Sequence, residues 1–444
     1  MLFSNKDVAV LDLTHGGIPL ARSIAKLAHS VTAVDVYGTV DKEVLSDLEK
    51  DEIIIKNNIN SIDPDLIVAP VHMDPGLVPD PFYCPVITHH MAVGVLLLNS
   101  IKSSRIIEIT GTGAKTSTAV LLADMASRSM SIVSHTTHGV EHWSNGVPEM
   151  IYQGLSIAPG SILEAMEHTS NIDPDLYIFE ISLGGTGAAD IGIITTLENE
   201  YTIANGTATS TAAKNQMVEY ARRRSTLLIN ALSNETINAP NSVRTVTFSD
   251  ISKDADVYLE DPGTGVRSIH YSGMDISFTP GTGYDPSAYS TAMACTAAAA
   301  AVLGIEPDTI RSSLEAFKGV DGRMRLKELF GRTIVDNSNS GMNIRSVEHA
   351  LDYSKKIASK KSRSILILGE EAQQVCEGLD PNDVSVFITD HVNEVDNIFL
   401  VGERMQIING NKISHFSSLD TAIKKARAIT SKNDIIISCV KCFR

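Results

Sequence analysis

A short glycine-containing loop between a strand and a helix constrains the fold of this chain more than any other segment. The apolar run at 105–110 predicts a buried strand, and a loop of small residues and a helix start follow it. The loop and the first helical turn consist of Gly111, Thr112, Gly113, Ala114, Lys115, Thr116 and Ser117. Backbone N–H groups of such a loop can point at phosphate oxygens, while Lys115 neutralises the outer phosphates and the Thr116 hydroxyl reaches Mg²⁺. The segment therefore predicts a nucleotide site; the alternative is a glycine turn with a capping threonine and an exposed lysine.

The rest of the chain alternates between apolar strand-like runs and helical patterns in three successive passes. Because domains contain roughly 100–200 residues, a chain of 444 residues is expected to form about three of them. Strands that alternate with helices predict parallel sheets with crossover helices, as in doubly wound folds. We therefore expect an α/β protein with domains at 1–103, 104–318 and 319–444.

Charge and cysteine usage bear on the partners and the compartment. The formal net charge of -16 provides no basic excess to displace counterions from a phosphate backbone, so we expect no nucleic-acid partner. The five cysteines are scattered and odd in number, which predicts reduced thiols in a cytoplasmic protein. The first residues lack the pattern of a signal peptide, and no apolar run has the length of a membrane span. We expect no membrane association.

The loop resembles the ATP loop of the Mur ligase superfamily, in which a compact Gly-Thr-x-Gly-Lys-Thr pattern opens the second domain. This chain has Ala114 where the family has its second glycine, and that position must tolerate the backbone geometry of the loop. The resemblance implies a Rossmann-like substrate domain, a central P-loop ATPase-like domain and a Rossmann-like C-terminal domain. It also implies ATP and Mg²⁺ as cofactors and a small molecule as the substrate.

Further segments match motifs of the superfamily. The strand that ends in Glu180-Ile181-Ser182 resembles a family strand whose glutamate holds Mg²⁺ and helps to place the attacking group. The resemblance therefore implies Thr116 and Glu180 as metal ligands. Lys214 follows two alanines, like a helix lysine that is carbamylated and binds magnesium in several members. Lys115, Glu180 and Lys214 are the implied catalytic residues; a surface carboxylate and an ordinary helix lysine are the alternatives for the last two.

The chain departs from the superfamily at a segment that normally contributes to a second metal. Thr196 stands in place of an asparagine, and Tyr201 in place of a histidine. A second metal site would need another ligand, for which Glu198 and Glu200 are the candidates.

Two residues of the third domain match family residues that act towards the nucleotide. Arg323 resembles the arginine of the Gly-Arg junction into that domain and would contact the nucleotide across the domain cleft. Asp336 matches an aspartate that acts towards ATP, and a turn or cap is its alternative. In this superfamily γ-phosphoryl transfer from ATP makes an acyl phosphate of the substrate, and a nucleophile then displaces phosphate in a site closed to water.

The first domain indicates the substrate. Its segments at 10–17, 34–37, 69–72 and 87–90 are unlike those of cell-wall ligases and resemble the methanogen branch that forms coenzyme F-430. The resemblance implies activation of a propionate side chain on a nickel seco-precursor, followed by attack of a carbon of the same macrocycle to close a carbocyclic ring. The histidines expected near this substrate are His15, His72, His89, His90, His135, His138 and His142, with His15, His89, His90, His135 and His138 as its direct contacts. A hydrogen-bonded loop histidine is the alternative for each.

Three other functions stay open at this point. One is an amide ligase that adds an amino acid to a pseudomurein or other cell-wall precursor. Another is a folate-type glutamate ligase. The third is a nucleotide-binding regulatory or scaffold protein with a degraded site, which Ala114 and the missing histidine would suit. We expect a monomer or a homodimer.

Overall fold

The computed structural model of this protein describes residues 2–60, 62–79, 84–198, 200–359, 361–371 and 378–442, apart from the side chains of 234–236. The chain forms two compact units, one made of 1–277 with 291–313 and the other of 278–290 with 314–444. Within the described residues, no helix is both long and apolar enough to cross a membrane. The expected α/β class is confirmed, because three sheets alternate with helices along the chain.

The first unit begins with a five-stranded parallel sheet in the order β3-β2-β1-β4-β5. Its strands are β1 Asp7–Leu11, β2 Ser30–Val34, β3 Ile54–Lys56, β4 Leu66–Ala69 and β5 Val86–Thr88. Its helices are α1 Gly17–Ala25, α2 Lys42–Lys50 and α3 His89–Ser100, with a short 3-10 turn η1 at Pro75–Leu77. The direction of winding reverses between β1 and β4. Ligands of doubly wound sheets bind at such a switch point, beyond the carboxyl ends of the strands.

An eleven-stranded sheet forms the remainder of the first unit, in the order β18-β17-β16-β15-β14-β11-β6-β10-β7-β8-β9. Its parallel strands are β6 Arg105–Thr110, β7 Ile132–Thr136, β10 Leu176–Glu180, β11 Ile191–Ile194, β14 Thr226–Asn230, β15 Arg244–Ser249 and β16 Val257–Glu260. The strands beyond β7 and β16 are β8 Gly139–Ser144, β9 Val147–Tyr152, β17 Arg267–Tyr271 and β18 Met274–Phe278. β8, β9 and β17 run antiparallel to the strand before each of them. A separate hairpin pairs β12 Thr202–Ile203 with β13 Ala208–Thr209.

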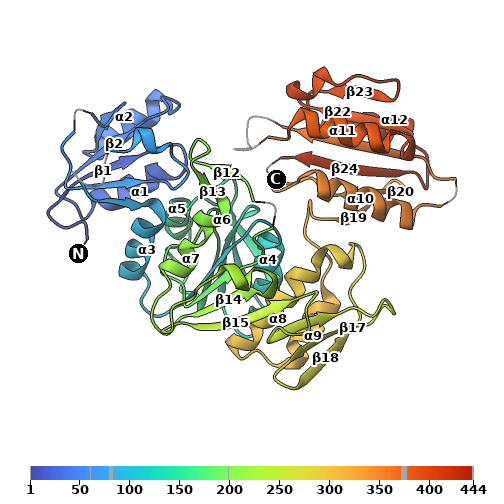
Figure 1. Ribbon diagram of the computed structural model, residues 1–444, viewed down its shortest axis with the longest axis horizontal. Helices are drawn as coiled ribbons and strands as arrows, with labels where there is room; N and C mark the ends of the chain where they lie inside the picture. Colours follow the sequence, from blue (N-terminus) through green and yellow to red (C-terminus); the bar gives the residue numbers. More distant parts are fainter. Residues whose placement is uncertain are drawn as a thin grey trace. The chain divides into compact units, whose positions relative to one another are not determined.

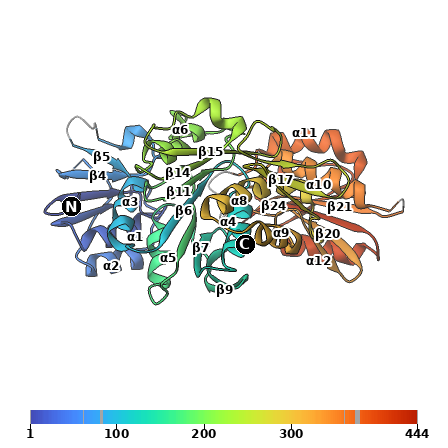
Figure 2. The same ribbon diagram turned by 90° about the horizontal axis from the view of Figure 1, so that it is seen from below.

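The helices that follow in the chain are α4 Lys115–Ala126, α5 Ser161–His168, α6 Ser210–Lys214, α7 Gln216–Glu219, α8 Ser290–Leu303 and α9 Pro307–Ala316, with a 3-10 turn η2 at Ala231–Thr236. A further 3-10 turn, η3 Pro286–Tyr289, lies in a segment of the second unit. The helices α1, α3 and α5 contact one another, and both views show them where the two sheets meet (Figures 1 and 2). At Gly94 of α3, a Cβ atom would lie 2.0 Å from the carbonyl oxygen of Thr186, so the helix backbone closely approaches the loop after β10. One hydrophobic core is therefore continuous between these sheets.

The second unit contains a six-stranded sheet in the order β19-β20-β24-β21-β22-β23, in which only the β19–β20 pair is antiparallel. Its strands are β19 Arg325–Leu329, β20 Arg332–Asp336, β21 Ser364–Glu370, β22 Asn397–Val401, β23 Ile413–Phe416 and β24 Ile435–Lys441. Its helices are α10 Ile344–Ile357, α11 Pro381–His391 and α12 Leu419–Ile429, with 3-10 turns η4 Val392–Glu394 and η5 Glu403–Ile407. Residues of α10 and α11 share one buried cluster and those of α12 another, which shows that helices cover both faces (Figure 1). The boundaries expected after 103 and 318 fall between sheets and stay predictions.

Candidate active site

The predicted phosphate loop joins β6 to α4 and is held against the end of β11. The backbone N–H of Thr112 donates to the carbonyl oxygen of Thr196 at 2.9 Å, and that of Gly113 donates to the Thr196 hydroxyl at 3.0 Å. A Cβ atom on Gly111 would lie 2.1 Å from Thr195 Oγ1, so only glycine permits this approach. The threonine that departs from the family pattern at 196 therefore fixes the loop. The first N–H groups of α4 have no intrahelical acceptor, which makes that helix start an anion-binding position.

Ala114 adopts the left-handed backbone conformation that the family provides with glycine. It is the N-cap of α4, with φ 60° and ψ 0°. A left-handed conformation costs a residue with a Cβ atom roughly 1–2 kcal/mol. An alanine at this position therefore strains the loop. Lys115 follows as the first residue of the helix, and its Nζ donates to the carbonyl oxygen of Gly111 at 3.1 Å.

The two predicted metal ligands contact each other directly. The Thr116 hydroxyl lies 3.0 Å from Glu180 Oε1 and 2.9 Å from Oε2, and both side chains are buried. The backbone N–H of Thr137 donates to Glu180 Oε2 at 3.2 Å, and its hydroxyl lies 3.2 Å from that of Thr116. These contacts join β10, α4 and the turn after β7. Carboxylate and hydroxyl oxygens are hard donors of the kind that Mg²⁺ prefers. The sequence did not single out Thr137, since only the fold brings it to Glu180.

Lys214 is buried at the end of α6, next to the residue that replaces the family histidine. Its Nζ donates to the carbonyl oxygen of Ser210 at 3.3 Å and lies 4.9 Å from the centre of the Tyr201 ring. A Cβ atom on Gly184 would lie 2.8 Å from the carbonyl oxygen of Ala213, so α6 packs against the segment that follows Glu180. Lys214 thus makes a cation-π contact with Tyr201, the residue that stands in place of the family histidine. A ligand role for Glu198 or Glu200 stays a prediction.

Three of the predicted substrate histidines are fully enclosed by protein. His89 Nε2 lies 2.9 Å from the carbonyl oxygen of Leu11, and His90 Nε2 lies 2.9 Å from that of Ser182. Burial lowers the pKa of His89, His90 and His135 to about 4, although Glu180 acts in the opposite direction on His135. These rings are therefore neutral at pH 7, and those of His89 and His90 hydrogen-bond to the backbone at the ends of β1 and β10. Their direct contact with substrate stays a prediction.

The other two histidines predicted to contact the substrate directly, His15 and His138, are half-buried. His138 belongs to the turn after β7, where its backbone N–H donates to Thr136 Oγ1 at 3.1 Å. His15 follows β1, and its Nδ1 lies 2.7 Å from Asp12 Oδ2. Sequence reasoning gave Asp12 no role of its own, although a carboxylate placed directly after a buried strand was a usable signal.

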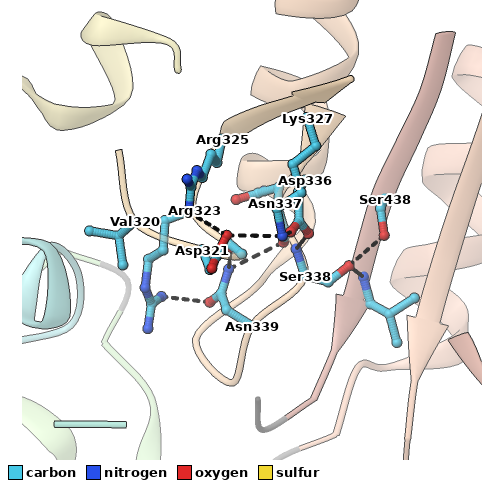
Figure 3. Close-up of polar contacts among 12 residues, drawn as sticks. Val320, Asp321, Arg323, Arg325, Lys327, Asp336, Asn337, Ser338, Asn339 and Ser438 are labelled. Atoms are coloured by element: carbon cyan, nitrogen blue, oxygen red, sulfur yellow. Dashed lines mark hydrogen bonds and ion pairs between the residues drawn. The ribbon is translucent and has the colours of Figure 1, made fainter. Parts of the chain in front are cut away.

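The second unit brings the two predicted nucleotide residues to one turn. Arg323 Nη1 donates to the side-chain oxygen of Asn339 at 2.6 Å, and the Asn339 amide nitrogen donates to the carbonyl oxygen of Gly322 at 2.7 Å. Asp336 ends β20, is buried, and forms an ion pair of 2.8 Å with Lys327 Nζ. Figure 3 shows Arg323 and Asp336 on either side of Asn339, with Asp321 and Lys327 beside them. This turn is tight because a Cβ atom on Gly322 would lie 2.2 Å from the carbonyl oxygen of Ser338.

Charge around this turn is balanced by neighbouring groups. Burial alone would lower the pKa of Lys327, but hydrogen bonds and attraction from Asp336 and Asp321 outweigh it and raise that pKa. The same lysine, with Arg325, lowers the pKa of Asp321 against the effect of burial. Asp336 is therefore held as part of an ion-pair network at the carboxyl end of β20, and its predicted role towards ATP is not tested by this arrangement.

Known proteins resemble this chain in sequence and in fold. A family model described as the C-terminal domain of coenzyme F430 synthetase CfbE matches residues 326–442. Coenzyme F(430) synthetase of Methanosarcina acetivorans is 45% identical, over 99% of this chain and 99% of that protein. The chain belongs to the coenzyme F(430) synthetase family. The enzyme of the same name from Methanocaldococcus jannaschii is 22% identical over 85% of this chain and 86% of its own length.

Solved structures show the fold of the family. MurF ligase from Thermotoga maritima, in complex with ADP, has a TM-score of 0.59 and 12% identity and covers 100% of this chain and 93% of its own. A pseudomurein peptide ligase type C from Methanothermus fervidus has a TM-score of 0.52 and 16% identity, with 98% and 97% covered. The expected three-domain architecture of Mur ligases is confirmed for this F(430) synthetase family member.

Proposed function

We propose that this F(430) synthetase family member uses ATP to activate a carboxylate as an acyl phosphate and then closes a carbocyclic ring. The substrate would be a nickel seco-tetrapyrrole, with a propionate as the activated group and a carbon of the same macrocycle as the nucleophile. The observation that supports this most is 45% identity along the whole chain to a coenzyme F(430) synthetase. The contact of Thr116 and Glu180 beside the phosphate loop supports the ATP-dependent step.

The proposed reaction has two steps, formation of the acyl phosphate and closure of the ring. A carboxylate oxygen attacks the γ-phosphorus of ATP, the bond to the bridging oxygen breaks, and ADP leaves. The nucleophilic carbon then loses its proton and attacks the acyl carbon, the C–O bond to phosphate breaks, and phosphate leaves. The net change for the macrocycle is the loss of one water. Because both reacting groups belong to one molecule, their effective concentration is high, and ring closure can outrun hydrolysis.

The described residues of the first unit have defined tasks in the first step. Lys115 at the start of α4 would offset the negative charge of the outer phosphates, and the N-terminus of the helix would supply N–H donors. Thr116 and Glu180 fit a magnesium ion, since their oxygens converge within hydrogen-bonding distance in a buried position. A magnesium ion bound there would supply charge neutralisation for the transferred phosphoryl group. Arg323 and Asp336 are proposed to act on the nucleotide from the second unit.

An amide-forming ligase is the second candidate, since the pseudomurein peptide ligase shares the fold over nearly the whole chain. The two functions differ in the mass of the product. We would incubate the full chain with ATP, Mg²⁺ and the nickel seco-precursor, with and without amino acids, and analyse products by mass spectrometry. Ring closure predicts a product lighter by one water, with ADP and phosphate released in equal amounts and no amine required. A product that forms only when an amino acid is supplied would replace the cyclase with an amide ligase.

A further inference from the structure

A cluster of one carboxylate and two imidazoles lies at the switch point of the five-stranded sheet. Asp12 directly follows β1, His15 is three residues further on, and His72 is in the loop after β4. The strands β1 and β4 are neighbours whose connections leave in opposite directions. Their carboxyl ends therefore open the crevice in which doubly wound sheets bind ligands. Asp12 and His72 lie 60 positions apart in the sequence and meet here because β1 and β4 are neighbours. The cluster is separate from the phosphate loop, which belongs to the other sheet.

The three side chains present metal-binding atoms to one another. Nδ1 of His15 lies 2.7 Å from Asp12 Oδ2, and Nε2 of His72 lies 3.3 Å from the same oxygen. One ligand atom from each of the three residues lies within 4.8 Å of the other two. The imidazole rings are perpendicular, at 83° with centroids 4.7 Å apart. This spacing lets all three donors reach a single ion after small side-chain movements, because metal–ligand bonds to nitrogen and oxygen are about 2.0–2.2 Å.

The charge on Asp12 is unusual for a residue with no exposed surface. Asp12 is wholly buried, and its Oδ2 lies against ring nitrogens of both His15 and His72. Its other Oδ accepts from the backbone N–H of Thr14 at 3.0 Å. Nε2 of His72 is buried, and although it lies close to Asp12 it makes no hydrogen bond of regular geometry within the described residues. A buried carboxylate is costly to desolvate, and a cation bound beside it would offset that cost.

A second histidine–aspartate pair in the same sheet shows what is specific to the cluster. His29 Nδ1 lies 2.8 Å from Asp7 Oδ1, but these side chains are 75% and 49% exposed. His15 and His72 are 33% and 28% exposed, whereas Asp12 is wholly buried. Within the described ranges, a third metal-binding side chain accompanies Asp12 and His15 but not Asp7 and His29. The exposed pair therefore provides a matched control.

We infer that Asp12, His15 and His72 form a binding site for a divalent transition-metal ion. Two imidazole nitrogens and one carboxylate oxygen are a donor set that suits zinc, cobalt, nickel and iron, and three protein ligands leave positions open for another molecule. The ion could come from solution or be held within a macrocycle, where only axial positions remain for an imidazole. The inference itself does not rest on the proposed function.

The test is a titration of the full chain with Co²⁺, followed by visible absorption, and with Zn²⁺ and Ni²⁺, followed by calorimetry. We expect one ion per chain, and a loss of affinity on the order of 10–100-fold or more in both His15→Ala and His72→Ala. His29→Ala should bind like the wild type, and circular dichroism would verify that each variant is folded. Asp12→Asn is an additional variant that retains the shape of the side chain.

A second titration distinguishes the two sources of the metal. A nickel tetrapyrrole is added to the same variants without ATP, and its absorption bands are recorded. Loss of free-ion binding in both histidine variants supports a site for an ion from solution. Band shifts that need His15 or His72, without free-ion binding, support a ligand to a metal held in the macrocycle. The inference is overturned if neither probe binds, or if the His15→Ala/His72→Ala double variant binds both like the wild type. Because neither titration uses ATP, failure here is separate from failure of ring closure.

Discussion

Two strand-to-helix connections of the first unit share a left-handed N-cap residue but suit ligands of opposite charge. The β1–α1 connection ends in Gly16 with φ 86°, and the β6–α4 connection ends in Ala114 with φ 60°. Both residues are left-handed N-caps, and neither makes a side-chain capping hydrogen bond. The first connection places Asp12 and His15 at the sheet end, which suits a cation. The second places Lys115 there, which suits phosphate. The comparison teaches that the parallel sheet positions the loop, and that side-chain chemistry then selects the ligand.

The largest expected effect is that of Lys115→Ala on turnover. Loss of a charge that stabilises a developing transition state costs on the order of 10²–10³ in rate. We expect that decrease in ADP release, with unchanged circular dichroism. Lys102→Ala removes an exposed lysine shortly before β6 and should have little effect. Near wild-type turnover in Lys115→Ala would remove this loop from the mechanism and break the comparison.

Glu180→Gln should raise the Mg²⁺ concentration needed for activity. The amide is nearly isosteric but lacks the charge that holds a hard cation, and loss of a metal contact typically costs on the order of 10–100-fold in affinity. Activity would be measured against Mg²⁺ concentration. Glu141→Gln is the control, because Glu141 is a buried glutamate of β8 in the same sheet. An unchanged magnesium dependence in Glu180→Gln would assign this glutamate to structure alone.

Two buried histidines should make the first unit less stable in mild acid. The pKa values of His89 and His90 are lowered to about 4 in the folded chain, against 6.5 for an exposed histidine. Between these values the unfolded chain binds more protons than the folded one, so stability decreases as pH falls from about 6.5 to about 4. Denaturant unfolding at several pH values would measure this. His89→Gln should flatten the dependence, since His89 braces the carbonyl of Leu11 beside Asp12; a slope unaltered in this variant would exclude His89 as a cause.

The smallest effects concern the two left-handed caps. Ala114→Gly should stabilise the chain by at most about 1 kcal/mol, because relief of the strain is partly offset by the flexibility of glycine. Gly16→Ala should destabilise it by about 1–2 kcal/mol, since the new Cβ atom would also lie 3.1 Å from Gly160 Cα. Thermal unfolding of both variants would give the signs. If both substitutions changed the stability in the same direction, the two connections would not share a strained left-handed N-cap.

The phosphate loop and its strand could be predicted because their signal is local. The predicted strand at 105–110 coincides with β6. Small residues and a lysine at the start of a helix need no long-range information. The start of α3 at His89 is also fixed locally, because the Thr88 side chain accepts a hydrogen bond from the N–H of Met91 and caps the helix.

The edge strands and the remaining site residues could not be predicted, because they depend on features that residue periodicity and motifs do not show. The antiparallel strands β8 and β9 lie at the sheet edge, where the residues of β9 are mostly exposed and have no apolar periodicity. The strands β15 to β18 pair with their neighbours in the chain, but they contain no motif on which the sequence argument relied. Asp12 and His72 are brought together only by the neighbouring positions of β1 and β4. The same holds for Thr137 and Glu180, which meet where β7 and β10 end.

The most direct test of carboxylate activation is the fate of the carboxylate oxygens. The nickel seco-precursor would be labelled with ¹⁸O in the reacting carboxyl group and converted with ATP and Mg²⁺. An acyl phosphate intermediate transfers one carboxylate oxygen to phosphate when the carbon nucleophile attacks. We therefore predict that the released phosphate contains one ¹⁸O atom and that the new ketone retains the other. Unlabelled phosphate, formed together with the cyclised product, would contradict acyl phosphate formation at this site.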